Sequence, residues 1–211
     1  MKKINILIIS IILVSFGVGV YFYPLMPERI VSHWNSNGQV NGYTSKFWGL
    51  FLMPIISTIM FLLFLLIPKI DPFKANVDKF RKYFDRFILA IIIFFFYVYI
   101  LTIFWHLGYR FNFVGFLIPA LSLLFYCAGI LIQNAKRNWF IGIRTPWTLS
   151  SDDVWDKTHQ LGGKLFKAAG IITLLGILFQ TLAIYFVLIP ILCFSLYLII
   201  YSYLEYQKES R

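Results

Sequence analysis

The chain has 211 residues, of which 60% are hydrophobic, 20% aromatic and only 13% charged, and its mean hydropathy is +0.77. This composition excludes an ordinary soluble protein and indicates an integral membrane protein. The formal net charge of +10 comes from basic residues divided among separate short segments, so it does not indicate a nucleic-acid partner.

Six apolar runs are suited to crossing the hydrocarbon core as helices, which takes about 20 residues each. These runs are Ile4–Tyr23, Phe47–Ile67, Phe87–Leu107, Phe113–Gln133, Leu165–Thr181 and Ile184–Tyr203. The remaining segments are too short for a soluble domain with its own core. We therefore predict an all-α integral membrane protein with six transmembrane helices and short interfacial helices in its cytoplasmic loops.

The first run follows Lys2 and Lys3 and is too long for a secretory signal peptide, so we predict that it is retained as the first helix. Six crossings place the loops alternately inside and outside. Of the 19 Lys and Arg residues, all except Arg29, Lys46 and Arg110 then fall on the same side as the N-terminus. Because basic residues favour the cytoplasmic side, both termini are predicted to be cytoplasmic.

Residues 24–46 separate the first two predicted helices. Two prolines, two glycines and four side-chain amides within residues 23–43 predict a compact, turn-rich loop instead of a helix. On composition alone, this is an interfacial loop that its aromatic residues anchor in the headgroup region. The alternative is a recognition loop for a molecule that arrives from outside, with His33, Trp34 and Asn35 supplying polar and aromatic contacts.

Residues 69–86 form a basic linker on the predicted cytoplasmic side. Pro68 and Pro72 end the second helix. Phe80 and Phe84 alternate with basic residues over Val77–Arg86, which predicts a helix at the membrane interface. We therefore predict an N-terminal two-helix module over 1–68, the linker over 69–86 and a four-helix module over 87–211.

Neither a metal site nor a disulfide is indicated. His33 and His106 both belong to the predicted outer side, with Glu28 near the first, but their spacing matches no zinc site. Cys127 and Cys193 lie inside predicted helices and are interpreted as packing residues. We predict no cofactor.

The cytoplasmic loop over 134–164 contains the run NWFIGIRTPWTL, residues 138–149. Gly142 permits backbone angles that other residues avoid, and Pro146 fixes its own φ and holds Thr145 extended. Arg144 therefore lies on a constrained turn beside Trp147. In one interpretation Arg144 pairs with acidic residues or lipid headgroups; in the other, the turn presents a surface to a partner.

A helix is predicted to begin near Ser151, because residues 150–153 read Ser-Ser-Asp-Asp and match a capping box. Gly162 and Gly163 are expected to bend this helix where it meets the fifth span. His159 is interpreted as a packing or hydrogen-bonding residue. Ser151, Asp152 and His159 fall on one helix without an oxyanion site, so they do not indicate a hydrolase.

The predicted spans carry no Asp, Glu, Lys or Arg near their centres. Pumps and ion-coupled carriers usually have ionisable residues there, so coupled transport is disfavoured. A receptor or binding protein, a passive facilitator and an unusual membrane enzyme remain as alternatives.

The run from Asn138 to Leu149, followed by Trp155 and His159, resembles the signature of the SdpI-type bacterial immunity proteins. The outer loop, with Pro27, the run His33-Trp34-Asn35 and Gly38, resembles the DUF1648-like N-terminal module that often accompanies it. The resemblance therefore covers both halves of the chain.

This resemblance implies a non-enzymatic protein of the bacterial cytoplasmic membrane that gives resistance to a secreted hydrophobic peptide toxin. It also implies that the toxin-bound protein holds a cytoplasmic autorepressor at the membrane, with membrane lipids as further contacts. Toxin binding is then expected at the outer residues His33, Trp34, Asn35 and Gly38. Partner binding is expected at Asn138, Gly142, Arg144, Thr145, Pro146, Trp147, Thr148, Trp155 and His159. The competing hypothesis is a membrane enzyme, or a protein that binds or modifies lipid headgroups, using Arg144 on a headgroup phosphate.

Overall fold

The structure is a computed structural model that describes residues 3–35 and 38–209, so Lys2 and Arg211 of the charge argument lie outside it. Most of the described chain is helical. In chain order the elements are α1 (Lys3–Phe22), a 3₁₀ turn (Tyr23–Leu25), β1 (Arg29–Trp34), β2 (Val40–Ser45), α2 (Lys46–Ile70), α3 (Lys74–Lys79), α4 (Arg81–His106), α5 (Phe113–Asn134), α6 (Pro146–Ser150), α7 (Asp152–Leu174), two 3₁₀ turns (Leu175–Ile177 and Gln180–Leu182) and α8 (Ala183–Glu209).

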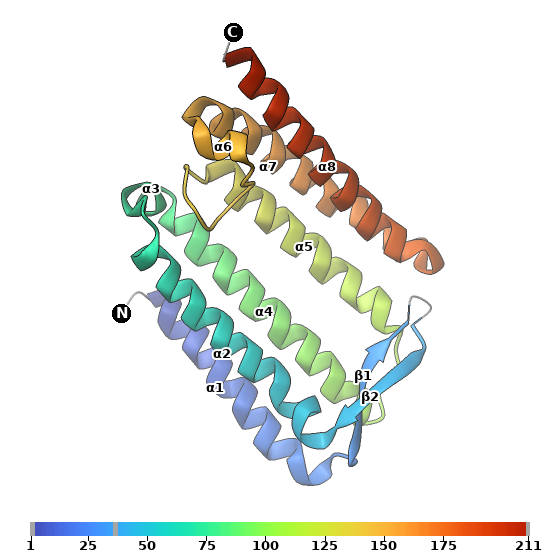
Figure 1. Cartoon of the computed structure of the whole chain (residues 1–211). Helices are drawn as coiled ribbons and strands as arrows, with labels where there is room; N and C mark the ends of the chain where they lie inside the picture. Colours follow the sequence, from blue (N-terminus) through green and yellow to red (C-terminus); the bar gives the residue numbers. More distant parts are fainter. Residues whose placement is uncertain (1–2, 36–37, 210–211) are drawn as a thin grey trace.

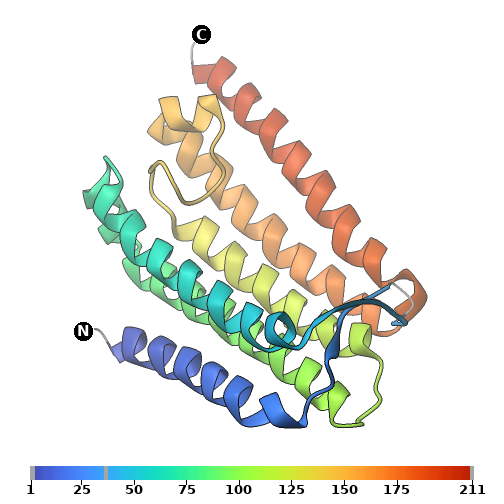
Figure 2. The same ribbon diagram turned by 60° about the horizontal axis from the view of Figure 1, so that its bottom comes forward.

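The long helices lie side by side in two groups of three (Figures 1 and 2). One group contains α1, α2 and α4, the other contains α5, α7 and α8, and α4 contacts α5 between them. The core of the first group is built from Ile8, Ile12, Phe61, Phe84, Ile88 and Ile92. These contacts join α4 to the N-terminal helices, whereas the predicted domain boundaries separate it from them. The boundaries stay predictions.

Glycines bring α5 and α7 into close contact. A Cβ on Gly129 of α5 would lie 2.7 Å from the carbonyl oxygen of Gly163 on α7. Two helical turns away along the same pair of helices, the hydroxyl of Ser122 on α5 donates to the carbonyl oxygen of Gly170 on α7 over 2.7 Å. Small residues of this kind let helix backbones approach closely in a membrane. The absence of a side chain at Gly163 therefore permits the close contact between α5 and α7. The helix does not end at the two glycines: α7 continues to Leu174.

Five helices are long and apolar enough to cross a membrane: α1 with its 3₁₀ turn, α2, α4, α5, and α8 with the preceding turn. They correspond to five of the six predicted runs. The remaining run, Leu165–Thr181, forms the second half of α7 and the turns after it, so it is continuous with the helix predicted to begin near Ser151. The first half of α7 carries charged side chains, which lowers its hydropathy. A sixth span and the orientation of the bundle stay predictions.

We call the two ends of the bundle the basic end and the hairpin end. The basic end holds the end of α2, the linker with α3, the start of α4, and the segment from the end of α5 to α6. The hairpin end holds β1 and β2 and lies at the opposite side of the bundle (Figure 1). Arg29, Lys46 and Arg110, the three basic residues predicted to lie opposite the N-terminus, all belong to the hairpin end.

The all-α expectation is wrong for the outer loop, which contains an antiparallel two-stranded hairpin. Arg29 pairs with Ser45 at its base and Trp34 with Val40 near its tip, with irregular register at His33. The β-branched and aromatic residues of both strands favour extended structure. A two-stranded hairpin is marginal by itself, and here Ile30 packs with Leu50 and Ile103 of the neighbouring helices.

The predicted interfacial helix over Val77–Arg86 is divided in the structure. α3 ends at Lys79 and α4 begins at Arg81, with Phe80 between them. Phe80 and Phe84 are buried in the core of the first helix group instead of facing the membrane interface. The charged residues of Val77–Arg86 are thus divided between two helices.

Candidate functional site

The loop between α5 and α6, residues 135–145, is organised by the buried side chain of Asn138. Its amide oxygen accepts hydrogen bonds from the backbone N–H groups of Phe140 (2.9 Å) and Ile141 (2.6 Å). Its amide nitrogen donates to the carbonyl oxygens of Lys136 and Ile141, both over 2.8 Å. One asparagine thus replaces the regular secondary structure that would otherwise satisfy these groups. We call residues 135–145 the motif loop.

His159 fastens the motif loop to α7. Its Nδ1 lies 2.8 Å from the carbonyl oxygen of Trp155, and its Nε2 accepts the backbone N–H of Ile143 over 3.0 Å. These partners require the neutral ring with its proton on Nδ1. Burial lowers the pKa of His159 from 6.5 to about 4, which keeps this form dominant at neutral pH. A packing and hydrogen-bonding role, as predicted from the sequence, agrees with these contacts.

Trp155 and Gly142 complete the contact with His159. The indole of Trp155 stacks on the imidazole with 3.9 Å between ring centroids, and its N–H donates to the carbonyl oxygen of Ala135 over 2.8 Å. Gly142 has φ of +114°, and a Cβ there would overlap with Nε2 of His159. The position therefore requires glycine for its backbone angle and for its lack of a side chain.

Two threonines form the junction between the motif loop and α6. Thr145 caps this short helix: its hydroxyl accepts the backbone N–H of Thr148, and the Thr148 hydroxyl accepts that of Thr145. The capping box thus lies here, and Pro146 occupies the first turn. The Thr145 hydroxyl also lies 3.0 Å from that of Ser202, and Trp147 packs on Tyr203, so α8 holds the turn in place.

The predicted capping box at residues 150–153 is wrong by one residue. Ser151 is the N-cap of α7, and its hydroxyl accepts the backbone N–H of Val154 over 3.2 Å. The third helical residue is therefore Val154, which has no polar side chain to return a bond. The predicted helix start near Ser151 is confirmed. The reciprocal hydrogen bonds of a capping box are instead made by Thr145 and Thr148 at α6.

Arg144 is an exposed cation of the motif loop, as is Lys136. One guanidinium N–H donates to the carbonyl oxygen of Trp139 over 2.6 Å. Asp152 pairs with Arg137 over 2.9 Å, so it is not the acidic partner that one interpretation of the sequence gave to Arg144. Trp139 and Phe140 are also exposed, by 48% and 39%. The outward surface of the loop therefore combines two exposed cations, Lys136 and Arg144, with two aromatic rings. In contrast, Asn138, Thr148, Trp155 and His159 are buried.

The predicted outer residues lie around the tip of the hairpin. Nδ1 of His33 lies 2.5 Å from the side-chain oxygen of Asn41 across the strands, and both residues are exposed. Asn35 closes the turn: its carbonyl oxygen accepts the N–H of Gly38, and its side chain accepts the N–H of Gln39. Gly38 has φ of +74°, as a turn glycine often has. His33 is thus the outer residue most available to a ligand.

Trp34 attaches the hairpin to the helices. Its ring stacks on Phe113 at the start of α5, with centroids 3.8 Å apart and planes 5° apart, and Trp105 of α4 meets it edge-on. The indole N–H is buried without a hydrogen-bond partner among the described residues. Trp34 therefore joins both helix groups at the hairpin end, and it is only partly exposed.

His106 is engaged in holding the hairpin. Nε2 accepts the backbone N–H of Val31 over 2.9 Å, and Nδ1 lies 2.8 Å from the carbonyl oxygen of Thr102. Both ring nitrogens thus have protein partners. Within residues 3–35 and 38–209, no three or more His, Cys, Asp and Glu side chains lie together as a metal site would require.

Comparison with known proteins places this geometry in a family. Residues 134–203 match the model of the SdpI/YfhL protein family, and residues 10–58 match the domain of unknown function DUF1648. The immunity protein SdpI of Bacillus subtilis (strain 168) is 28% identical over 206 residues, which cover 98% of this chain and 95% of SdpI. The chain therefore contains an SdpI/YfhL region that follows a DUF1648 region, and it is a distant relative of SdpI along its length. No solved structure gives a significant match.

The two matched regions coincide with the two polar sites. The match over 134–203 contains the motif loop, α6 and α7, and the match over 10–58 contains the hairpin. These sites lie at opposite ends of the bundle (Figure 1). A ligand of the hairpin and a ligand of the motif loop would therefore bind at opposite ends of the helix bundle.

Sequence reasoning missed Asp71, a buried carboxylate at the end of α2. One oxygen accepts the backbone N–H of Phe73 over 2.7 Å, and the other accepts that of Trp139 in the motif loop over 3.0 Å. Asn76 adds a bond from its side chain to the carbonyl oxygen of Arg137. The linker between α2 and α4 therefore supports the motif loop. The lone acid in Pro-Lys-Ile-Asp-Pro was the available signal.

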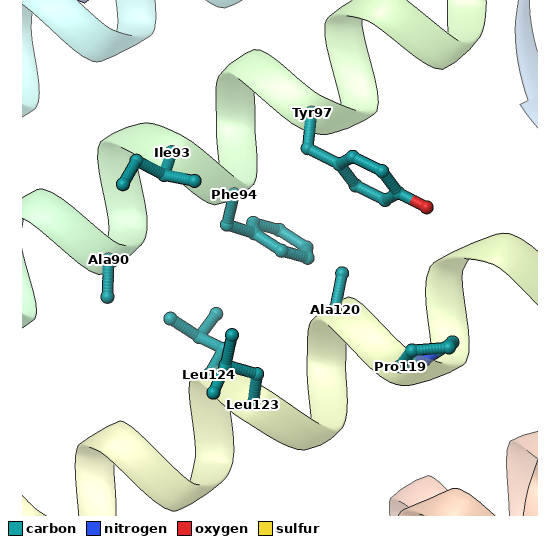
Figure 3. A pocket seen from close by; sticks show the side chains of 8 residues that line it. All are labelled: Ala90, Ile93, Phe94, Tyr97, Pro119, Ala120, Leu123 and Leu124. Carbon is teal, nitrogen blue, oxygen red and sulfur yellow. The ribbon is translucent and has the colours of Figure 1, made fainter.

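An apolar groove of about 430 Å³ separates α4 from α5 (Figure 3). Its lining is Ala90, Ile93, Phe94 and Tyr97 from α4, and Pro119, Ala120, Leu123 and Leu124 from α5. Near the hairpin end the Tyr97 hydroxyl crosses between the helices and donates to the carbonyl oxygen of Phe116 over 3.0 Å. The groove lies within two apolar helices and is suited to hydrocarbon chains.

Proposed function

We propose that this protein is a membrane immunity protein that protects its cell from a secreted hydrophobic peptide toxin. The observation that carries the proposal is the similarity to immunity protein SdpI along almost the whole length of both chains. A match restricted to the motif loop would support a shared fold alone. Here the hairpin, the linker and the helices are all included.

The arrangement of the two polar sites supports a receptor that acts by binding. In the proposed orientation, with both termini in the cytoplasm, the hairpin and His33 face the side from which a toxin arrives. Arg144, Trp139 and Phe140 then face the cytoplasm, where an autorepressor is available for capture. Coupling the two requires two states of the bundle with different toxin affinities. Trp34 contacts both helix groups, so a relative movement of the two groups would change its ring contacts.

The test is survival of a Bacillus subtilis strain that lacks its own SdpI, challenged with the toxin against which SdpI protects. We expect expression of this protein, or of SdpI as the positive control, to raise survival. If the protein reaches the membrane at the level of SdpI and gives no protection from that toxin or from one encoded beside its own gene, the immunity proposal is rejected.

Two sets of variants separate the proposed sites. Arg144→Ala removes a charge with five N–H donors, and we expect it to weaken recruitment of a tagged repressor more than protection. Trp147→Ala should act in the same direction. His33→Ala combined with Trp34→Ala should weaken both. Equal loss of protection and recruitment in the Arg144 variant, at normal membrane levels, would contradict this division.

A further inference from the structure

A second groove lies at the basic end, where the motif loop meets α7 and α8. Its volume is about 260 Å³, and its lining includes Ile143, Arg144, Phe166, Ser195, Leu198 and Ile199. Arg144 contributes the only formal charge of the lining. The groove is thus apolar along α8 and cationic beside the motif loop.

The charge of Arg144 is not balanced by the acidic residues around it. Among the described residues no carboxylate lies within salt-bridge distance of its guanidinium, and its one hydrogen-bond acceptor is the neutral carbonyl of Trp139. The neighbouring acids are engaged elsewhere: Asp152 with Arg137, Asp156 with Lys136, and Glu205 with Lys157 and Lys208. Four guanidinium N–H groups therefore remain for an external anion.

The apolar part of the groove continues onto the exposed face of α8. Ile199 in the lining is 44% exposed, and Leu192 and Leu196, which follow toward the hairpin end, are 58% and 62% exposed. These residues belong to a helix that is apolar enough to span a membrane. A chain held in the groove can therefore extend along α8 into hydrocarbon. Trp147 and Tyr203 pack together nearby, and such amphipathic rings suit the headgroup region.

We propose that the groove binds an anionic phospholipid, with the headgroup phosphate on Arg144 and one acyl chain between α7 and α8. A guanidinium matches the geometry of phosphate oxygens, and Phe166, Leu198 and Ile199 match an acyl chain. A free phosphate would leave the apolar lining unused. An acidic peptide would have to place its own polar backbone against that lining. This proposal does not depend on a toxin or a repressor.

The test measures lipid binding to the purified full-length protein by native mass spectrometry in detergent. Phosphatidylglycerol and phosphatidylcholine with identical acyl chains are titrated separately, and glycerol phosphate serves as the competitor without acyl chains. We expect phosphatidylglycerol to bind more tightly. Arg144→Ala should weaken that binding about tenfold or more, because charge-assisted hydrogen bonds to phosphate are lost. Glycerol phosphate should not displace the lipid.

Matched variants control for non-specific effects. Arg110 at the hairpin end is also exposed and also donates to the carbonyl oxygen of the residue five positions earlier, Trp105, so Arg110→Ala is the control for charge. Ser195→Phe should fill the groove and weaken binding of both lipids. Cys193→Phe, at an exposed position of the same helix, should not.

Three results would overturn the proposal. The first is an equal effect of Arg144→Ala and Arg110→Ala, and the second is an equal effect of Ser195→Phe and Cys193→Phe. The third is displacement of phosphatidylglycerol by glycerol phosphate, which would indicate a site for the free anion. Thermal unfolding without added lipid shows whether each variant is folded. If Ser195→Phe does not fold, the comparison of Arg144→Ala with Arg110→Ala still decides the proposal.

Discussion

His159 links the protonation of one side chain to the stability of the motif loop. The folded protein holds its pKa at about 4, mainly through burial, whereas the ordinary value is 6.5. The unfolded chain therefore binds more protons between these values, and the free energy of unfolding falls as the pH drops from about 6.5 toward 4. A shift of this size corresponds to a loss of up to ~3 kcal/mol.

The prediction is that His159→Gln reduces this pH dependence. Thermal unfolding of the detergent-solubilised wild type should shift to lower temperature between pH 7 and pH 4.5, and the variant should shift less because glutamine does not titrate. The variant should be less stable than the wild type at pH 7, since the stacking on Trp155 is lost. Identical pH dependence in both proteins would show that another group is responsible.

Gly142 allows its backbone angle and its side-chain space to be tested separately. Gly142→Ala requires an alanine at φ of +114° and also places a Cβ against His159. Gly108→Ala requires φ of +100° but meets no atom within 4 Å. We expect Gly108→Ala to cost about 1–2 kcal/mol for backbone strain, and Gly142→Ala to cost clearly more. Thermal unfolding of both variants measures the difference, and equal losses would mean that His159 moves away without cost.

The sequence indicated the local geometry of the motif loop more completely than the contacts of its side chains. Gly142, Thr145 and Pro146 were recognised as shaping a turn, because their preferences are local. The inward orientation of Asn138 and Thr148 was not recognised, since it depends on loop carbonyls and on partners that are distant in sequence, such as Ser202. Arg144 remains the residue for which both a protein partner and a lipid are proposed.

At the scale of the elements, the linker between α2 and α4 supports the motif loop through Asp71. Asp71→Ala removes a buried acceptor from two backbone N–H groups, those of Phe73 and Trp139. Leaving such donors unpaired typically costs ~1–3 kcal/mol each. We therefore expect a lower unfolding temperature and easier proteolysis of the motif loop. Asp78→Ala, at an exposed acid of α3, is the control and should change neither; matching behaviour of the two variants would contradict the structural role.

The elements themselves were predicted with uneven success. Long apolar runs gave helices close to their expected bounds, because a span in hydrocarbon must satisfy its backbone internally. The hairpin was missed, since Pro, Gly and Asn between residues 24 and 42 indicated turns more strongly than the β-branched residues indicated strands. The start of α7 was recognised from Ser151, but its continuity through Gly162 and Gly163 was not. That continuity depends on packing against α5 and the motif loop.

At the scale of the whole molecule, the proposed orientation is open to a direct test. Gln39→Cys at the hairpin end and Ser150→Cys at the basic end are both at exposed positions. Each is made in a protein whose Cys127 and Cys193 have been replaced. In intact cells an impermeant thiol reagent should label Gln39→Cys alone, because the asymmetry of basic residues places Ser150 in the cytoplasm. Permeabilised cells should show labelling of both, and labelling of Ser150→Cys alone in intact cells would reverse the orientation.

α7 carries too many polar residues to enter a bilayer readily by itself. Asp152, Asp153, Lys157, Lys164 and Lys167 are distributed over its first two thirds. Lys167 is satisfied by α5, where its ammonium donates to the side chain of Gln133 over 2.6 Å, and the glycine contacts bring the same two backbones together. In the predicted six-span topology, α7 therefore inserts together with α5, which leaves the ribosome first. We expect a nascent chain with a disrupted α5 to leave α7 outside the lipid, where membrane quality-control proteases degrade it.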